Sequence, residues 1–138
     1  MRRARQRITT ALTTIALAGQ PLVASADSVI ATEGEMVVTL LGTGTPAPLL
    51  DRFGYATLVS AGEQVLLFDV GRGAVQRLWQ VGLLPGEVDE VFLTHYHSDH
   101  LISLPDLWLT SWLPPYGAKS DPLRITGPAG VRALTEGL

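Results

Sequence analysis

Residues 93–100 read Leu-Thr-His-Tyr-His-Ser-Asp-His, and this stretch holds all three histidines of the chain. It directly follows an apolar run that predicts a β-strand. Where the backbone is still extended, His95 and His97 point the same way, because side chains alternate along a strand. The chain then turns, so the adjacent Asp99 and His100 diverge toward a neighbouring position. We therefore predict that His95 and His97 bind one metal ion and that Asp99 and His100 bind a second.

A donor set of imidazoles and a carboxylate favours zinc. Two zinc ions about 3.5–4 Å apart can share a water molecule, lower its pKa toward about 7 and polarise the bond under attack. We therefore expect two zinc ions and a hydrolytic reaction. The alternative is a group of surface or capping residues at a strand-to-helix turn, and Asp99 taken alone is also typical of a helix cap.

The rest of the chain alternates short strands with helices. Apolar, β-branched runs predict strands, and apolar residues at helical spacing predict helices. The first run, residues 36–41, predicts a buried strand, and the loop 61–63 predicts a hairpin. This order indicates a layered α/β domain. The expected strands are residues 36–41, 55–60, 64–69, 88–93 and 123–126, and the expected helices are 74–81, 103–113 and one that Pro128 opens.

Composition limits the chemistry and the partners. The chain is 46% hydrophobic and 17% charged, which is typical of a domain with a packed core. It has no cysteine, so zinc would need histidine and carboxylate ligands. Four of the ten basic residues lie in the first seven positions, so residues 27–138 hold six basic and thirteen acidic residues, a net charge of −7. An acidic body binds polyanions poorly, and we therefore expect a small-molecule ester as substrate and no nucleic acid.

The first 26 residues are typical of a secretory signal peptide. A basic start precedes an apolar run that ends in Ala24-Ser25-Ala26, a small-x-small cleavage site. We expect cleavage after Ala26, a periplasmic or secreted product, and no stable membrane insertion after processing. A retained membrane anchor is the alternative, although the run is short for a span of about 20 apolar residues. Residues 27–35 would then be a linker and 36–138 the folded domain.

The His-x-His-x-Asp-His stretch resembles the defining motif of the metallo-β-lactamase superfamily. Residues 41–46 (Leu-Gly-Thr-Gly-Thr-Pro), 66–73 (Leu-Leu-Phe-Asp-Val-Gly-Arg-Gly) and 98–107 are similar to its ribonuclease Z and arylsulfatase-like branch. The resemblance implies a four-layer αβ/βα sandwich with two zinc ions. It also implies that Asp99 is both a metal ligand and a general base.

Asp69 resembles the buried aspartate that orients metal ligands from behind in this superfamily. Such support is what metal-bound histidines usually need. A cap for the helix after Gly73 is the alternative role. Ser103 departs from the branch pattern, which has glycine at this position.

The later ligands of the superfamily, a further histidine for each metal and a bridging aspartate, have no counterpart here, since no histidine follows His100. The resemblance therefore implies the N-terminal half of the sandwich, incomplete at its C-terminus. We expect a zinc-dependent hydrolase of a sulfate ester, phosphodiester or lactone in the cell envelope. One alternative is a non-catalytic truncated product with at most weak metal binding, and another is a ribonuclease Z-like phosphodiesterase.

Trp108 and Trp112 are spaced i, i+4, so they share one face of the expected helix. Packing in the core is the simpler interpretation. The alternative is a wall of the substrate cleft, since small-molecule sites are largely apolar.

Overall fold

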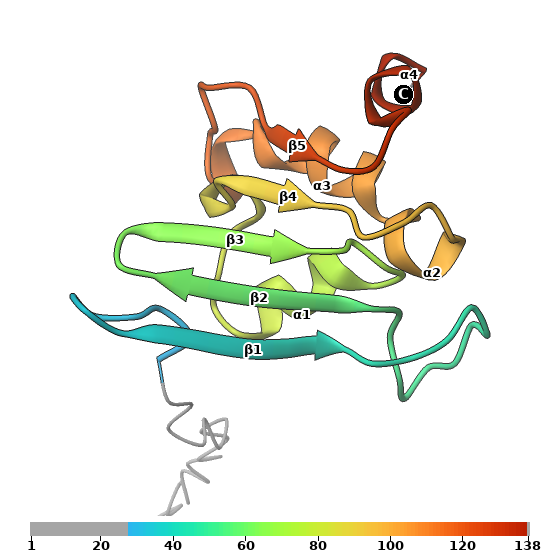
Figure 1. Ribbon diagram of the computed structural model, residues 1–138. Helices are drawn as coiled ribbons and strands as arrows, with labels where there is room; N and C mark the ends of the chain where they lie inside the picture. Colours follow the sequence, from blue (N-terminus) through green and yellow to red (C-terminus); the bar gives the residue numbers. More distant parts are fainter. Residues whose placement is uncertain (1–27, 138) are drawn as a thin grey trace, which may run out of the picture.

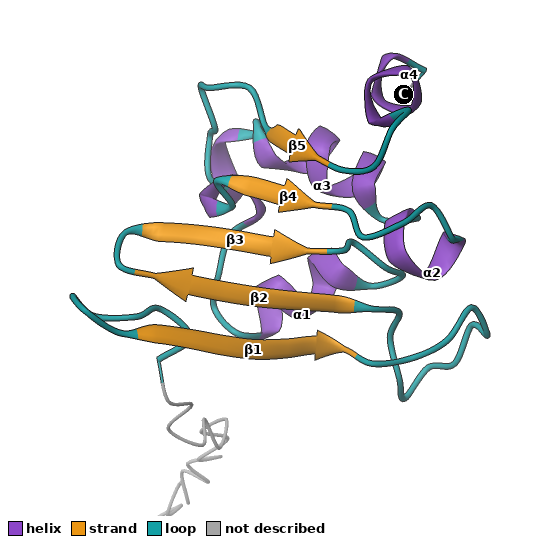
Figure 2. Ribbon diagram, in the orientation of Figure 1, coloured by secondary structure: helices purple, strands orange, loops and turns teal. Residues whose placement is uncertain are grey.

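The computed structural model describes residues 28–137 as one five-stranded sheet with helices on one of its faces (Figure 1). The strand order follows the chain order, from β1 to β5. This two-layer arrangement confirms the expected α/β class (Figure 2). The strands are β1 Met36–Gly42, β2 Ala56–Ala61, β3 Gln64–Phe68, β4 Glu90–Phe92 and β5 Arg124–Thr126.

The pairing of the strands changes once along the sheet. The pairs β1–β2 and β2–β3 are antiparallel, whereas β3–β4 and β4–β5 are parallel. Parallel neighbours need a crossover connection, and helices fill both crossovers. The helices are α1 Ala74–Gln80, η1 Pro85–Glu87, α2 Ser98–Leu101, α3 Leu104–Ser111, η2 Pro114–Tyr116 and α4 Val131–Glu136.

One face of the sheet makes the core with α1 and α3. Alternate residues of β2 and β3 point into it, as the period-two pattern of a half-covered strand requires. Leu58 and Leu67 are fully buried there, and so are Leu78 of α1 and Leu107 of α3. The carboxyl ends of β3 and β4 lie side by side at one edge of this core, which is where the His-x-His-x-Asp-His loop begins (Figure 1).

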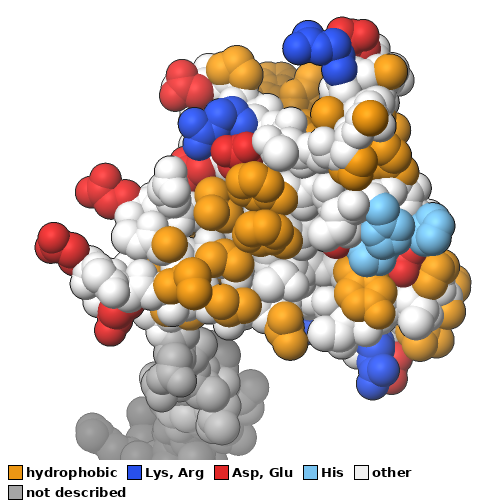
Figure 3. Space-filling view, viewed as in Figure 1, with side chains coloured by type: hydrophobic (Ala, Val, Ile, Leu, Met, Phe, Trp, Pro, Cys, Tyr) orange, Lys and Arg blue, Asp and Glu red, His pale blue; other side chains and the backbone are white. Residues whose placement is uncertain are grey.

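The opposite face of the sheet carries apolar side chains that no described element covers (Figure 3). In β1, Met36, Val38 and Leu40 are 68%, 54% and 67% exposed. The prediction of a buried first strand was therefore wrong. The strand lies at the sheet edge, where α1 covers only one of its two faces. On the same face, Phe68 of β3 stacks against Phe92 of β4 with ring centroids 4.9 Å apart.

Other differences from the sequence-based expectations are local. Trp108 and Trp112 are 44% and 57% exposed, so the interpretation as core residues was wrong. The buried face of α3 is made by Leu104, Leu107 and Ser111 instead. The last helix begins at Val131 rather than at Pro128, and the short helix α2 within the histidine stretch was not predicted.

The expected signal peptide lies outside the described residues. Part of the expected linker is packed on the sheet, since the backbone N–H of Ala31 donates to Ser60 Oγ at 2.8 Å and Ala31 is buried. Among residues 28–137, no helix is long and apolar enough to cross a membrane.

Candidate metal centre

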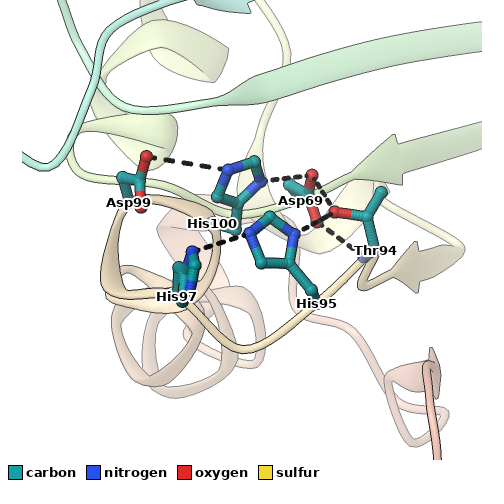
Figure 4. A network of polar contacts seen from close by, with 6 residues as sticks. All are labelled: Asp69, Thr94, His95, His97, Asp99 and His100. Carbon is teal, nitrogen blue, oxygen red and sulfur yellow. Dashed lines mark hydrogen bonds and ion pairs between the residues drawn. The ribbon is translucent and has the colours of Figure 1, made fainter.

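Asp69 lies directly after β3 and connects the two ends of the histidine loop (Figure 4). Its Oδ1 accepts a hydrogen bond from the Thr94 backbone N–H at 2.8 Å, and its Oδ2 lies 2.7 Å from His100 Nδ1. The Thr94 hydroxyl also donates to Oδ2 at 2.8 Å. The helix after Gly73 has no side-chain cap, so the alternative role of Asp69 as its cap is wrong.

The backbone of Asp69 turns sharply to place this carboxylate. Its φ is 62°, in the left-handed region that aspartate tolerates better than most residues. Its N–H continues the sheet by donating to the Phe92 carbonyl at 2.8 Å. The Asp69 side chain, at the end of β3, therefore points toward the end of the neighbouring strand β4, where the histidine loop starts.

The three histidine rings gather at the same edge. His95 Nε2 lies 3.1 Å from His97 Nδ1, so the two rings meet as the period-two alternation predicts. The His95 and His100 ring centroids are 4.0 Å apart, with the rings tilted by 52°. Thr94 Oγ1 lies 3.0 Å from His95 Nδ1 and thus links the His95 ring to the Asp69 carboxylate (Figure 4).

Asp99 completes the cluster from the first turn of α2. Its side chain is 6% exposed, and Oδ2 lies 3.6 Å from His100 Nε2. Its Oδ1 is buried and has no hydrogen-bond partner among the described residues. The N-cap of α2 is His97, without a side-chain cap hydrogen bond, so the alternative of Asp99 as a cap is not what the structure shows.

The donor chemistry fits zinc. A buried carboxylate oxygen without a partner is costly unless a cation or donor satisfies it, and the neighbouring imidazoles are ordinary zinc ligands. Among residues 28–137, however, no three histidine, aspartate or glutamate side chains are placed to hold one metal ion. By their nearest donor atoms the four side chains form two pairs, His95 with His97 and Asp99 with His100, and the His95 and His100 ring centroids lie 4.0 Å apart.

Close backbone packing fixes Asp99 against the strand ends. A Cβ added at Gly71 would lie 2.1 Å from the Asp99 carbonyl oxygen, and one added at Gly54 would lie 2.9 Å from it. Val70 N–H donates to the His100 carbonyl at 2.7 Å. Glycine at these two positions therefore lets the turn after β3 contact the histidine loop directly.

Ser103, which departs from the branch pattern, has a structural role. It is buried, and its Oγ accepts a hydrogen bond from Gly73 N–H at 3.2 Å. Its own N–H donates to the Val70 carbonyl at 3.0 Å. The serine thus joins the start of α1 to the start of α3, behind the cluster.

Sequence reasoning missed two contributors to this centre. Thr94 bonds Asp69 through both its N–H and its hydroxyl, although 25 residues separate them. Tyr55 stacks its ring on His100. Thr94 directly precedes the first histidine, which was the signal that could have identified it. No neighbouring sequence feature indicated a role for Tyr55.

Trp108 and Trp112 do not line this centre. They border shallow surface hollows together with residues 119–123 and, for Trp108, with Ile125 and Thr135. Those hollows include no residue of the histidine loop, so the alternative of a cleft wall beside these donors has no support among the described residues.

Comparison with known proteins agrees with the motif. The model of the metallo-beta-lactamase superfamily matches residues 49–137. Ribonuclease Z of Mycobacterium marinum is 46% identical over 101 residues, which are 73% of this chain and 36% of the relative. Ribonuclease Z of Mycobacterium bovis is 48% identical over 99 residues, which are 72% of this chain and 35% of the relative. The chain thus spans about a third of the length of these curated relatives.

Solved structures show the same likeness in three dimensions. The short form of human tRNase Z aligns with a TM-score of 0.65 and 33% identity, over 75% of this chain and 39% of that one. The metallo-beta-lactamase fold protein YhfI of Bacillus subtilis aligns with a TM-score of 0.63 and 25% identity, over 73% and 42% of the two chains. From its motif, its fold and these relatives, the chain belongs to the metallo-β-lactamase superfamily and is similar to the ribonuclease Z members of it.

Proposed function

We propose that this chain supplies the His-x-His-x-Asp-His part of a two-zinc centre in a hydrolase that cleaves phosphodiester bonds. The observation that supports this most is the buried Asp99, whose Oδ1 has no partner beside a group of three imidazoles. Such an arrangement is unfavourable for a chain that binds nothing there, because a buried carboxylate oxygen without a partner is costly. It is suited to cations that the same oxygens and nitrogens would bind.

Each donor has a distinct role in this proposal. His95 and His97 hold the first zinc ion, and Asp99 and His100 hold the second. Asp69 keeps Nδ1 of His100 engaged, which leaves Nε2 for the metal. Bound zinc supplies Lewis acidity to the substrate oxygen and acidifies a water molecule. Asp99, with its Oδ2 on the side of His100 Nε2, accepts the proton of the attacking water.

The phosphodiester substrate rests on the relatives. The curated relatives at 46–48% identity are named ribonuclease Z, which describes enzymes that cleave RNA. This name favours the phosphodiesterase alternative over a sulfate ester or lactone, and it counts against the expectation of no nucleic acid. A small ester in the cell envelope is the second candidate, favoured by the net charge of −7 over residues 27–138.

A chimera tests the zinc centre within a longer chain. Residues 28–137 would replace the matching segment of the Mycobacterium marinum ribonuclease Z, which supplies the part that this chain does not cover. We expect bound zinc, measured by mass spectrometry, and hydrolysis of bis(p-nitrophenyl) phosphate and of RNA. Asp99→Ala and His97→Ala should each remove most of the activity and lower the zinc content, whereas the exposed Trp112→Ala should keep both.

Two outcomes would contradict the proposal. The first is a folded chimera in which Asp99→Ala is as active and as zinc-rich as its parent. The second is a chimera that cleaves p-nitrophenyl sulfate or a lactone but neither phosphodiester, which would favour the small-ester candidate instead.

A further inference from the structure

We infer that Tyr55 is a positioning residue for His100: its ring fixes the plane of the imidazole, and thereby the direction in which Nε2 points. The function of this positioning rests on the proposed zinc centre. The positioning itself is supported by the contact between the Tyr55 and His100 rings. The two rings are stacked, with centroids 4.6 Å apart and planes 17° from parallel.

A hydrogen bond alone does not fix this ring. The contact between His100 Nδ1 and Asp69 Oδ2 holds one atom of the imidazole at 2.7 Å. The ring can still tilt about that point and turn Nε2 away from Asp99. A nearly parallel aromatic neighbour opposes such a tilt, because offset stacking is lost when the planes rotate. Together the two contacts restrain the imidazole, whose Nε2 lies 3.6 Å from Asp99 Oδ2.

Tyr55 is itself held by the turn that follows Asp69. Its carbonyl accepts a hydrogen bond from Gly71 N–H at 2.9 Å, and the preceding Gly54 N–H donates to the Arg72 carbonyl at 3.0 Å. A Cβ added at Gly71 would lie 2.6 Å from the Tyr55 backbone nitrogen, so the two segments are in close contact. The segments that carry this carboxylate and this aromatic ring are therefore joined through their backbones.

The tyrosine hydroxyl is not part of this role. The described contacts of Tyr55 with His100 involve the ring, and the side chain is 40% exposed. Phenylalanine should therefore replace Tyr55, whereas a branched aliphatic side chain should not. Tyr116, which meets Trp79 edge-on at 6.0 Å and is 37% exposed, offers a matched control away from the histidines.

The first test needs no metal. Nitrogen-15 spectra of the histidine rings in the full metal-free chain, at about pH 8.5 where an ordinary imidazole is neutral, report the tautomer and the ring-current shift of His100. We expect a single Nδ1–H tautomer with upfield ring protons in the parent, in Tyr55→Phe and in Tyr116→Leu. Tyr55→Leu should lose the upfield shift and show a mixture of tautomers. Unchanged His100 signals in a folded Tyr55→Leu chain would overturn the inference.

The second test uses cobalt(II) as a coloured substitute for zinc, in the chimera proposed above for the zinc centre. Tyr55→Leu should weaken cobalt binding about three- to tenfold, as the usual strength of an aromatic pair implies, and should change the visible absorption bands. Tyr55→Phe should restore both the affinity and the bands. Equal cobalt affinity and identical bands in Tyr55→Leu and the parent would contradict the role. If the folded parent chimera bound no cobalt at all, the proposed function would fail, while the metal-free test of Tyr55 would still decide the inference.

Discussion

His100 Nδ1 lies 2.7 Å from Asp69 Oδ2, although 31 residues separate them along the chain. The other oxygen of the same carboxylate accepts the Thr94 backbone N–H at 2.8 Å. One side chain at the end of β3 therefore holds both ends of the loop that carries the histidines. Asp69 is thus one of the main contacts that position the predicted metal donors.

Replacing Asp69 should loosen the loop and weaken zinc binding together. Asp69→Ala leaves the Thr94 N–H and His100 Nδ1 without their acceptor. Because Thr94 is exposed and His100 only partly buried, the loss of unfolding free energy should lie toward the low end of the roughly 1–3 kcal/mol that a fully buried group would cost. Zinc affinity should fall about 10- to 100-fold, as is usual when the hydrogen-bond partner of a ligand is removed. Asp69→Asn keeps one acceptor oxygen and tolerates the φ of 62°, so it should be milder in both respects. Urea unfolding and zinc competition titration measure the two effects, and an Asp69→Ala chain equal to the parent in both would show that the Asp69 contacts are unimportant.

Replacing Asp99 should weaken zinc binding without lowering the stability of the metal-free chain. Its unpartnered Oδ1 contributes no hydrogen bond among the described residues. Asp99→Asn should therefore leave the metal-free chain as stable as the parent or slightly more stable, because it removes a buried charge. Zinc binding should nevertheless become much weaker, since a carboxylate ligand is lost. Thermal unfolding with and without zinc separates these outcomes, and a destabilised variant that binds zinc normally would assign Asp99 a structural role instead.

Gly71 should not accept even one methyl group. The Cβ of Gly71→Ala would lie 2.1 Å from the Asp99 carbonyl oxygen, so the turn or the loop must move. The cost should reach or exceed the upper end of the usual 1–3 kcal/mol or so for overpacking. Gly62→Ala is the control, because a Cβ there meets nothing within 4 Å and only its φ of +58° adds strain. Denaturant midpoints compare the two, and a Gly71→Ala chain no less stable than Gly62→Ala would show that the loop adapts freely.

The apolar sheet face should make the chain self-associate. Exposed apolar side chains on β1, beside partly exposed ones on β2 and β3, form a surface of the kind that favours aggregation. The double variant Met36→Lys, Leu40→Lys places two like charges on this face at exposed positions. We expect light scattering at increasing protein concentration to show larger species for the parent than for the variant. The reverse order, with the folded variant associating more strongly, would rule out this face as the contact.

Processing after Ala26 stays a prediction, because the cleavage site lies outside the described residues. N-terminal sequencing of the protein from an envelope fraction should give a mature start at Asp27. A start at Met1 or Arg2 in the cytosol would show that the export prediction is wrong.

Much of the sheet could be predicted because its signals are local. The Ala-Gly-Glu hairpin loop and the alternating apolar runs lie within a few residues of the strands that they define, and β2 and β3 begin and end within one residue of the expected bounds. The histidine pair follows in the same way, because period-two alternation alone brings His95 and His97 together.

What could not be predicted depends on residues far apart in the sequence. The stacking of Tyr55 on His100 and the bond from Gly73 to Ser103 exist only once the strands are in place. The exposure of Trp108 and Trp112 was missed for a related reason. Their spacing puts them on one face of α3, but Leu104, Leu107 and Ser111 form the face that meets the sheet.

The order of strands from β1 to β5 bears on the protein's synthesis. Because each strand pairs with the one made just before it, the sheet can form strand by strand as the chain leaves the ribosome, in keeping with the N-terminal-first folding of domains. The contact between Asp69 and His100 can form as soon as residue 100 has been synthesised. Two other hydrogen bonds of the loop form only after residues 126–128 have been synthesised. They run from the Leu93 N–H to the Thr126 carbonyl and from the Tyr96 hydroxyl to the Pro128 carbonyl. If translation stalled after His100 but before Thr126, the nascent histidine loop could make its contact with Asp69 but not its hydrogen bonds to Thr126 and Pro128.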